Sequence, residues 1–516
     1  MFTDRHQSSA ATQKRCWKLF RRLLAIISLA VVTSIARPVL FLWDVWRLDV
    51  SKRAQLPQGR IDDASAQNES SVREVWKVPD DVSAAEQQLK ELLARARDGN
   101  LKVSIAGARH SMGGHTIAPD GIVIDMTTLK FMSLDESSNI LTVGSGAIWH
   151  DVLAYLDPLG RSVHVMQSND SFTAGGSISV NCHGWQFDRP PIASTVESFR
   201  LMKADGTIVN CSRSENSELF SLVLGGYGLF GIILDARLQV TSNVRYRVTR
   251  HVVPSTEAMA TYRSKVVASG NAAMVYARLD VSQENFLREA IIYVLAEDPP
   301  EDGKLLPVVP PGFVSLRRSI FRGSTESEYG KRLRWDAETK LQPTLTPSLY
   351  TRNQVLYEGV EVFQNRTADT TDILHEYFLP PDSLVSFMAQ VQSIIPKAKA
   401  NLLNVTIRSV DQDNDTFLRY ADKPMLAAVM LFSQQRTAAA NKAMQLLTQQ
   451  LIDAALSMNG RYYLPYRLHA TSEQFHRAYP QAKKFFALKR AHDPRELFVN
   501  QFYLTYGNQH VVTKEN

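Results

Sequence analysis

Three glycine-rich stretches hold the residues whose types and spacing best suit the binding of a phosphate-bearing ligand. The first covers residues 104–116, where an expected strand gives way to small residues and an Arg-His pair. Small residues let the backbone bend sharply and bring several N–H groups close to an anion. The ligand-binding candidates here are Ala106, Gly107, Ala108, Arg109, His110 and Ser111. Taken alone, this stretch fits an ordinary turn between two strands equally well.

Two later stretches repeat the pattern, at residues 171–184 and 225–233. Three such turns are hard to explain by packing alone, because an extended cofactor with several phosphate contacts needs several close backbone approaches. His183 fits either a cofactor contact or a structural role in a His-Gly turn. The candidates in these two stretches are Thr173, Gly175, Gly176, Ser179, His183, Gly226, Gly228 and Ile232.

The elements expected around these turns are the short strands and helices of an α+β fold. A capping box, Ser83 with Glu86, is expected to open a helix at 84–97 that carries a leucine face. From about residue 246 a strand–helix–strand–strand pattern occurs twice, which predicts one antiparallel sheet covered by helices on one side. Further expected elements are strands at 75–78, 102–106, 121–126 and 140–143, and helices at 149–156 and 437–457.

Length and composition indicate two or three globular domains. The chain has 516 residues, of which 44% are hydrophobic and 21% are charged. A net charge of +6 is mild for this length and no aromatic-basic motif is found, so we expect no nucleic-acid partner. Three cysteines show neither a disulfide framework nor metal-ligand spacing, and we predict no metal site.

The N-terminus has the layout of a membrane-targeting segment. Five basic residues between Lys14 and Arg22 precede an apolar run at 23–36, and the apolar character resumes at 39–46 after Arg37-Pro38. With this continuation the segment is long enough to span a bilayer once, placing the body on the non-cytoplasmic side. The alternative is a signal peptide cleaved after Ala36.

The order of the motifs resembles the FAD-binding domain of vanillyl-alcohol-oxidase-type flavoproteins over residues 73–245. The motifs are Ala-Gly-Ala-Arg-His-Ser, an Ala-Gly-Gly turn followed by His-Gly, and Gly-Gly-x-Gly-x-Phe-Gly-Ile. The resemblance implies a two-lobed, PCMH-type FAD-binding domain plus a cap domain, an antiparallel sheet flanked by helices, with FAD as cofactor. The ending from Asp493 to Asn500 is similar to a signature with which sugar and aldonolactone oxidases return to the flavin, which makes Asn500 a cofactor candidate.

This resemblance divides the chain into five parts. They are a basic flank with a membrane anchor or signal at 1–50, a linker at 51–72, the FAD-binding domain at 73–245, a substrate or cap domain at 246–460 and a C-terminal segment at 461–516. Within the cap, residues 297–342 are proline-rich and then basic. We interpret this insertion as a mobile lid or surface helix, with a solvated, partly disordered segment as the favoured alternative.

Catalytic candidates come from the cap and the C-terminal segment. Asn404 and Arg408 share one face of an expected strand. Tyr466 and Arg467 stand around the position where related sugar oxidases have a lysine near the flavin, and that lysine is absent. Tyr466 is the first acid/base candidate and His469 the second.

His110 stands where several relatives tether the flavin through a histidine. The cofactor is therefore expected to be FAD, either linked covalently through His110 or held by a hydrogen bond from it. The layout from Glu376 onward resembles decaprenylphosphoryl-ribose oxidase and the alditol oxidases most.

The resemblance implies a membrane-anchored, FAD-dependent oxidoreductase that takes hydride from a hydroxylated carbon. The expected substrate is a sugar, polyol, lactone or lipid-linked sugar, and the acceptor is oxygen, a quinone or another carrier. Two alternatives remain, a flavin-dependent double-bond reductase and a non-catalytic flavin-binding component of a membrane complex.

Overall fold

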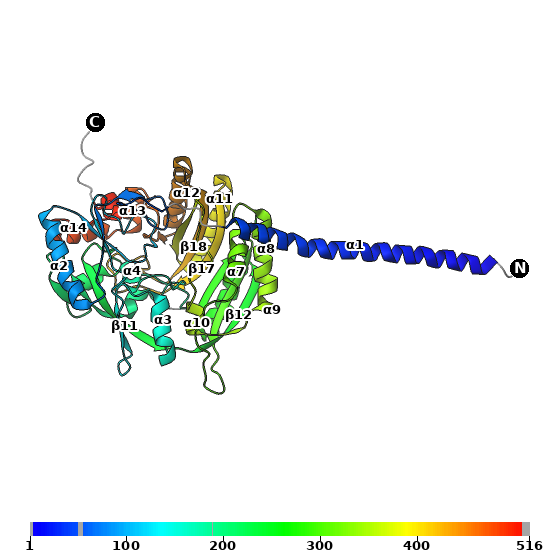
Figure 1. Cartoon of the computed structure of the whole chain (residues 1–516), viewed down its shortest axis with the longest axis horizontal. Helices are drawn as coiled ribbons and strands as arrows, with labels where there is room; N and C mark the ends of the chain where they lie inside the picture. Colours follow the sequence, from blue (N-terminus) through cyan, green and yellow to red (C-terminus); the bar gives the residue numbers. More distant parts are fainter. Residues whose placement is uncertain (1–3, 50–54, 188, 508–516) are drawn as a thin grey trace.

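Three larger β-sheets, a small β-hairpin and the helices packed on them form the body of the protein, and one long helix projects from it (Figure 1). The computed structural model describes residues 4–49, 55–187 and 189–507. The expected α+β class is therefore confirmed. Two of the sheets belong to the expected FAD-binding domain and the largest belongs to the cap.

The first lobe is a parallel three-stranded sheet in the order β3-β5-β4, with α2 packed beside it. The expected leucine face of α2 is buried, but its predicted capping box does not form. Asp81 caps the helix instead, accepting a hydrogen bond from the N–H of Ala84 at 2.8 Å. The elements are β3 (Glu74–Lys77), α2 (Val82–Asp98), β4 (Val103–Ala106) and β5 (Ile122–Asp125).

The second lobe is an antiparallel sheet in the order β10-β9-β11-β7-β6, with β8 paired to β11. Its long strand β11 begins at Ile232, within the third glycine-rich stretch, so that strand holds the turn in place. The elements are β6 (Met132–Asp135), β7 (Ile140–Gly144), α3 (Trp149–Leu156), β8 (Arg161–Val163), α4 (Ala174–Ser179), β9 (Val196–Met202), β10 (Ile208–Ser212), α5 (Ser217–Val223) and β11 (Ile232–Ser242).

The cap contains the antiparallel sheet that the repeated pattern predicts. Its eight strands run in the order β15-β12-β14-β13-β17-β18-β16-β19, and α12 packs on β16, β18 and β19. The elements are β12 (Arg245–Pro254), α6 (Ala258–Tyr262), β13 (Ala272–Leu279), β14 (Glu289–Glu297), β15 (Leu349–Thr351), α10 (Arg352–Leu356), β16 (Thr370–Leu379), α11 (Leu384–Ala398), β17 (Asn401–Val410), β18 (Met425–Gln435), α12 (Ala438–Ser457) and β19 (Arg461–Tyr462).

The insertion at 297–342 has two parts: residues 298–313 contain no helix or strand and are mostly exposed, whereas the part from Val314 onward is helical and partly buried. It contains α7 (Val314–Arg322), α8 (Glu328–Asp336), a π-helical turn at Ala337–Leu341 and the start of α9 (Gln342–Leu345). Its large side chains Phe321 and Trp335 are buried, and apolar burial stabilises a helix that polar residues alone would not. Its mobility stays a prediction.

The segment at 51–72 was expected to be a polar linker, and its second half is structured instead. Residues 51–54 lie outside the described part of the chain. Strands β1 (Arg60–Ile61) and β2 (Ser70–Ser71) form a hairpin whose connection buries Asp63 and Ser65. Composition misleads here because these polar side chains bond to one another and to the first glycine-rich stretch.

The N-terminal segment forms one helix, α1 (Asp4–Leu48), with Pro38 inside it. Among the described residues, no helix combines the length and the apolarity needed to cross a membrane. The predicted membrane segment is therefore unsupported. Charges at Arg22 and Arg37 bound the uninterrupted apolar run at 23–36 and leave it too short. The non-cytoplasmic location of the body stays a prediction.

The C-terminal segment returns to the first lobe, as expected. Its helices are α13 (Ser472–Ala478), α14 (Ala482–His492) and α15 (Gln501–Tyr506), and Thr471 with Gln474 forms a capping box at the start of α13. Figure 1 shows these red helices beside the blue α2. Val103 of β4 exchanges backbone hydrogen bonds with Leu497 and Val499. Residues 508–516 lie outside the described part.

A buried ion pair holds this return in place. The Asp493 carboxylate accepts hydrogen bonds from the N–H groups of Leu497 and Phe498 and pairs with the Lys489 ammonium. The side chains of Asp493 and Lys489 are 2% and 0% exposed.

We expect Asp493→Asn to lower the free energy of unfolding by about 3–5 kcal/mol, because it leaves a buried charge without its partner. Urea unfolding measures this change. The matched control is Asp453→Asn, whose carboxylate lies 3.9 Å from Arg477 with both side chains more than half exposed; it should change stability by less than about 0.5 kcal/mol. Equal effects of the two substitutions would contradict the prediction.

Candidate functional site

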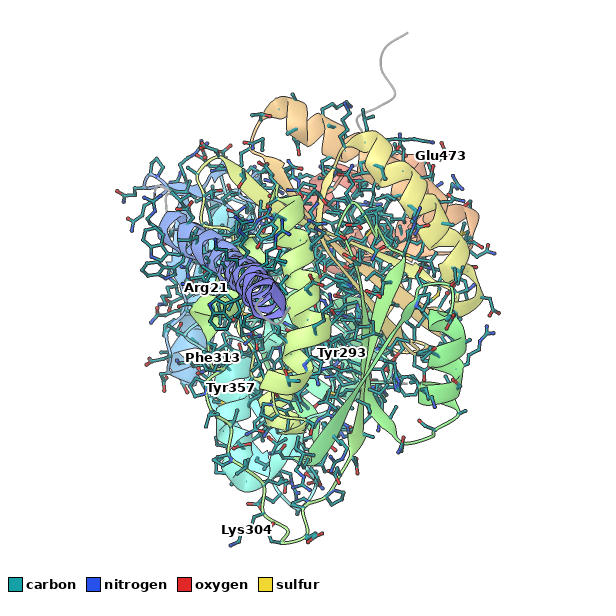
Figure 2. All side chains as sticks on the ribbon, turned by 90° about the vertical axis from the view of Figure 1, so that its right-hand side faces the viewer. Arg21, Tyr293, Lys304, Phe313, Tyr357 and Glu473 are labelled. Atoms are coloured by element: carbon teal, nitrogen blue, oxygen red, sulfur yellow. The ribbon has the colours of Figure 1, made fainter. Side chains whose placement is uncertain are left out.

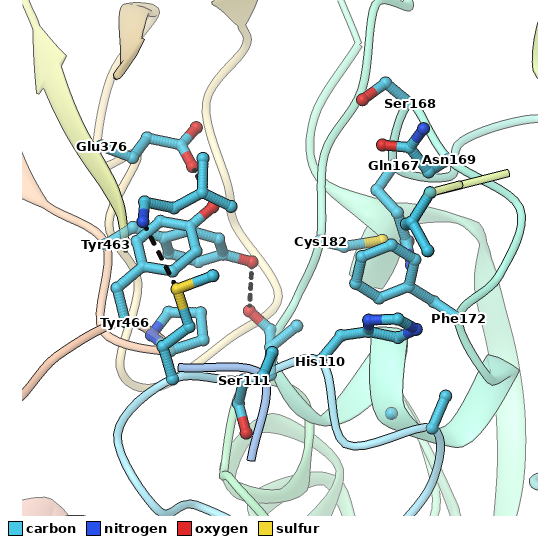
Figure 3. Close-up of a pocket in the computed structure, with 18 of the residues that line it drawn as sticks. His110, Ser111, Gln167, Ser168, Asn169, Phe172, Cys182, Glu376, Tyr463 and Tyr466 are labelled. Carbon is cyan, nitrogen blue, oxygen red and sulfur yellow. Dashed lines mark hydrogen bonds between the residues drawn. The ribbon is translucent and has the colours of Figure 1, made fainter. Parts of the chain in front are cut away.

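A cavity of about 760 Å³ lies between the glycine-rich stretches and the cap sheet. One side is formed by the loop after β4, by α4 and by the start of β11. The other side is formed by residues of β13, β14, β16, β17 and β18 together with the insertion. Figure 3 shows His110 and Phe172 facing Tyr466, Tyr463 and Glu376 across this space.

The first glycine-rich stretch presents free backbone donors to the cavity. β4 ends at Ala106, and residues 107–111 all line the cavity. Within the described part of the chain, the N–H groups of these five residues donate to no protein acceptor. Arg109 has a φ of 57°, in the left-handed region. Where right-handed and left-handed residues alternate, successive backbone N–H groups point toward one position. This arrangement suits a phosphate.

The second stretch packs so closely on the first that side chains have no room. A Cβ at Gly107 would overlap Oγ1 of Thr173, and a Cβ at Gly175 would lie 2.6 Å from Cβ of Ser145. Thr173 also caps α4, since its hydroxyl accepts a hydrogen bond from the N–H of Gly176. Thr173, Gly175, Gly176 and Ser179 all line the cavity.

The third stretch lines the cavity through Tyr227, Gly228, Gly231 and Ile233, of which the sequence predicts only Gly228. Gly228 lines the cavity with a φ of 72°, which favours glycine. Gly226 instead packs against the carbonyl of Leu222 within its own turn. The side chains of Ile232 and Ala106 point into hydrophobic clusters and do not line the cavity.

Asn500 also lies outside the cavity lining, and it acts as a clamp between two of the stretches. Its side-chain N–H groups donate to the carbonyls of His115 and Tyr227, both at 2.9 Å. Its Oδ1 accepts from the N–H of Tyr503 and so caps α15. The chain ending therefore holds the first and third stretches at a constant separation.

These features fit FAD. The free N–H groups of residues 107–111 match a diphosphate, and the lack of side chains at Gly107 and Gly175 lets the backbone pack closely against Thr173 and Ser145 at the cavity wall. FAD, once bound, supplies a ring that accepts a hydride. The residues that would hold it are Gly107, Ala108, Arg109, His110, Ser111, Thr173, Gly175, Gly176, Ser179 and Gly228.

His110 is placed to use one specific ring nitrogen. Its Nε2 lies 3.1 Å from the carbonyl oxygen of Ser171. A carbonyl only accepts, so Nε2 carries the proton and Nδ1 keeps a free lone pair. Burial lowers the pKa of His110, which keeps the imidazole neutral. A neutral ring with a free nitrogen is what covalent attachment to a flavin requires, and the link itself stays a prediction.

A buried carboxylate that the sequence analysis missed forms the other wall. Oε1 of Glu376 lies 2.5 Å from Nε2 of His183, and Oε2 accepts the hydroxyl of Tyr466 at 3.0 Å. Burial favours the neutral acid, but His183, Arg408 and Tyr466 together outweigh it and lower the pKa of Glu376. The available signal was a charged residue within the otherwise apolar end of β16.

Burial and the neighbouring Glu376 carboxylate keep Tyr466 in its neutral form. Burial, followed by the charge of Glu376, raises the pKa of Tyr466 well above its ordinary value. His183, expected near the cofactor, does line the cavity and also bonds to Glu376. The group of Glu376, His183 and Tyr466 is called the carboxylate cluster below.

The two candidates on β17 also line the cavity. Arg408 donates to the hydroxyl of Ser168 at 3.1 Å and has no carboxylate within ion-pair distance in the described part of the chain. Oδ1 of Asn404 accepts from Arg278 at 2.6 Å and from Arg334 at 2.8 Å. Arg408 therefore keeps free donors for a ligand, while Asn404 is held by its neighbours.

Arg467 and His469, both catalytic candidates, lie outside the cavity lining. Arg467 does not face the cavity as its neighbour Tyr466 does, and its guanidinium donates to the side chain of Asn68 at 2.6 Å. His469 is buried against Thr448, and burial together with Arg467 lowers its pKa to about 2. A group that stays neutral and has no access to the cavity does not serve as its acid or base.

We expect Gly107→Val to weaken FAD binding about ten- to hundredfold, because overpacking against Thr173 costs about 1–3 kcal/mol. The flavin content of the purified protein, read from visible absorbance, measures the effect. Gly312→Ala is the control, since nothing lies within 4 Å of the added Cβ. Full flavin content in the valine variant would contradict the assignment.

If His110 carries a covalent flavin, acid precipitation leaves the yellow colour in the protein pellet. His110→Ala should then move the flavin into the supernatant, because no nitrogen remains for the bond. A colourless pellet from the unaltered protein would reject the link and leave the non-covalent site intact.

Comparison with known proteins agrees with this site. Residues 83–212 match the family model described as "FAD binding domain". The chain is 31% identical over 153 residues to L-gulonolactone oxidase of Mus musculus, covering 30% of this chain and 34% of that protein. It is 33% identical over 168 residues to cytokinin dehydrogenase 3 of Oryza sativa subsp. japonica, covering 31% of each chain.

The chain therefore spans about a third of the length of these relatives in each match. The matched region contains β4 and its loop, α4, His183 and most of the second lobe. The three glycine-rich stretches, the free donors and the match agree on one cofactor. Residues 83–212 are thus similar to the FAD-binding domain family, and the protein binds FAD.

Proposed function

We propose that the protein is an FAD-dependent oxidoreductase that oxidises a hydroxylated carbon of a small molecule. The observation that carries the proposal is the carboxylate cluster facing the FAD side of the cavity (Figure 3). Oxidation of an alcohol removes a hydride and a proton. FAD supplies the hydride acceptor. The chain must then supply a group for the proton.

Tyr466 and Glu376 suit that task together. The Tyr466 hydroxyl donates its hydrogen to Glu376, so its oxygen lone pairs are free to accept the hydrogen of a substrate hydroxyl. As the substrate proton passes to the Tyr466 oxygen, the Tyr466 proton passes to the Glu376 carboxylate. The substrate loses two electrons with the hydride and becomes a carbonyl compound, and Glu376 ends the step protonated.

His183 and Arg408 prepare the carboxylate for this role. Both lower the pKa of Glu376, so it is ionised and able to take a proton near neutral pH. Arg408 also offers unused guanidinium donors to the cavity, which suits a substrate oxygen. Asn404 lies beside these groups and shapes the wall rather than the proton path.

A sugar, polyol or lactone fits this site best. The relative named L-gulonolactone oxidase supports that class, while the relatives named cytokinin dehydrogenase keep a second class in view. Anaerobic bleaching of the flavin by a panel of lactones, polyols, aldoses and a cytokinin separates the two. Recovery of the colour in air then separates oxygen from a quinone or another carrier as acceptor. A panel without bleaching would contradict the proposal.

We expect Tyr466→Phe and Glu376→Gln each to slow flavin reduction about 10²–10⁴-fold, because each removes one proton acceptor of the relay. Stopped-flow absorbance with a saturating substrate measures the rate, and FAD content should stay unchanged. Tyr463→Phe is the matched control. It lies in the same cavity, but its hydroxyl donates to the carbonyl of Val180 at 2.8 Å and not to Glu376. Equal slowing in the control would reject the relay.

A further inference from the structure

The docked end of α1 lies against the insertion, on the side away from the cavity. Figure 2 looks along α1, with Arg21 on the projecting part of the helix. Nearer the body, the guanidinium of Arg37 lies 4.1 Å from the ring centre of Tyr329. The ring of Phe41 meets Tyr329 edge-on at 5.1 Å. The contact is thus between α1 and helices α7 and α8.

Phe41 occupies a notch made by two glycines of the insertion. A Cβ at Gly323 would lie 2.9 Å from the Phe41 ring, and one at Gly330 would lie 3.1 Å from it. The two glycines also approach each other closely, since a Cβ at Gly330 would overlap the Gly323 carbonyl. Such shape-specific packing ties the position of α8 to that of α1.

A buried ion pair continues the contact beyond the end of α1. Arg318 of α7 holds both oxygens of the Asp49 carboxylate, with Nη2 at 2.7 Å from Oδ1. The side chains of Arg318 and Asp49 are 5% and 15% exposed. The remaining Nη1 of Arg318 donates to the carbonyl of Glu361. One guanidinium therefore links α1 to the loop at 357–363.

The insertion and the loop at 357–363 also form part of the wall of the cavity. Arg317, next to Arg318, lines the cavity and pairs with Glu358 at 2.7 Å. Glu358, Val360 and Phe363 of the loop line it as well. Two further lining residues, Glu338 and Gln342, come from the end of the insertion and contact the Tyr293 hydroxyl. The insertion therefore has α1 on one face and the cavity on the other.

We infer that Asp49 and Phe41 of the N-terminal segment are positioning residues for the substrate end of the cavity. They act through Arg318, Gly323 and Gly330 on the wall formed by the insertion and the loop at 357–363. Binding of substrate then depends on the docked end of α1, although no α1 residue lines the cavity. This inference rests on the proposed function only for its kinetic readout.

The physical reason is the cost of an unpaired charge. Without the Asp49 carboxylate, the buried Arg318 guanidinium must turn toward solvent or take another acceptor. Either movement disturbs its hydrogen bond to Glu361 and the neighbouring Arg317–Glu358 pair. The wall then loses its fixed geometry, while the FAD-binding stretches, held by Asn500 and Thr173, do not move.

The test compares Asp49→Asn and Phe41→Ala with matched controls in the full-length holoprotein. Asp44→Asn is the charge control, because its pair with Arg47 is more than half exposed. Leu40→Ala is the size control, because Leu40 is 63% exposed. We expect both test variants to raise KM about tenfold or more with kcat changed less than about threefold and FAD content unchanged.

A second readout needs no substrate. Trypsin should cleave within the helical part of the insertion, residues 314–342, several-fold faster in the test variants than in the controls, because the insertion opens more often. KM values and cleavage rates equal to those of the controls would overturn the inference, as would loss of FAD in parallel with the rise in KM. If no substrate reduces the flavin of the unaltered protein, the proposed function fails and the cleavage rates still decide this inference.

Discussion

One buried carboxylate connects the three parts of the molecule. Glu376 belongs to the cap, His183 to the FAD-binding domain and Tyr466 to the C-terminal segment, and the three meet with Glu376 only 3% exposed. Taking a carboxylate out of water is costly unless its oxygens are satisfied, so the cap sheet packs well only when both other segments bring their donors. The same hydrogen bonds that offset the desolvation cost also place the proposed proton acceptor at the cavity wall. The carboxylate cluster therefore forms when the three segments pack together.

Local signals point to several glycines of the cavity wall because the shape of that wall depends on the backbone. Gly107, Gly175 and Gly228 stand out in the sequence since no other residue allows the close approach or the positive φ found there. The cap sheet was also predictable, because the repeated strand–helix pattern indicates a layer of strands with helices packed on it. Thr471 with Gln474 forms a capping box at the start of α13, whereas α2 is capped by Asp81 and not by Ser83. Sequence patterns of this kind do not decide between neighbouring capping residues.

The side chains on the cap side of the cavity were harder to predict, because the direction of each side chain determines whether it faces the cavity. Tyr466 and Arg467 are neighbours, yet one faces the cavity and the other faces Asn68. Glu376 acquires its importance from partners that are 193 and 90 residues away along the chain, so nothing near it in sequence marks it. The same holds for residues 60–71 and for α1, where polar or apolar composition suggested a linker and a membrane span. A tertiary contact with Gly114 explains the position of Asp63, and one with Arg318 explains that of Asp49, whereas the apolar side chains Leu23, Val32 and Ile35 of α1 are exposed.

The clamp made by Asn500 has a consequence for the order of events during synthesis. The side chain of Asn500 donates to the carbonyl of His115, which lies 385 residues earlier in the chain. Val103, at the edge of its sheet, likewise forms its hydrogen bonds with Leu497 and Val499 only after these late residues have been synthesised. While the ribosome is still translating the cap, the nascent FAD-binding lobes have an open edge and an unclamped first loop. Contacts of such long sequence separation form late, and the exposed strand edge of β4 is a site for aggregation until they do. The cofactor site is therefore completed only after Asn500 has left the exit tunnel, and a premature stop before Asn500 yields a chain without this clamp.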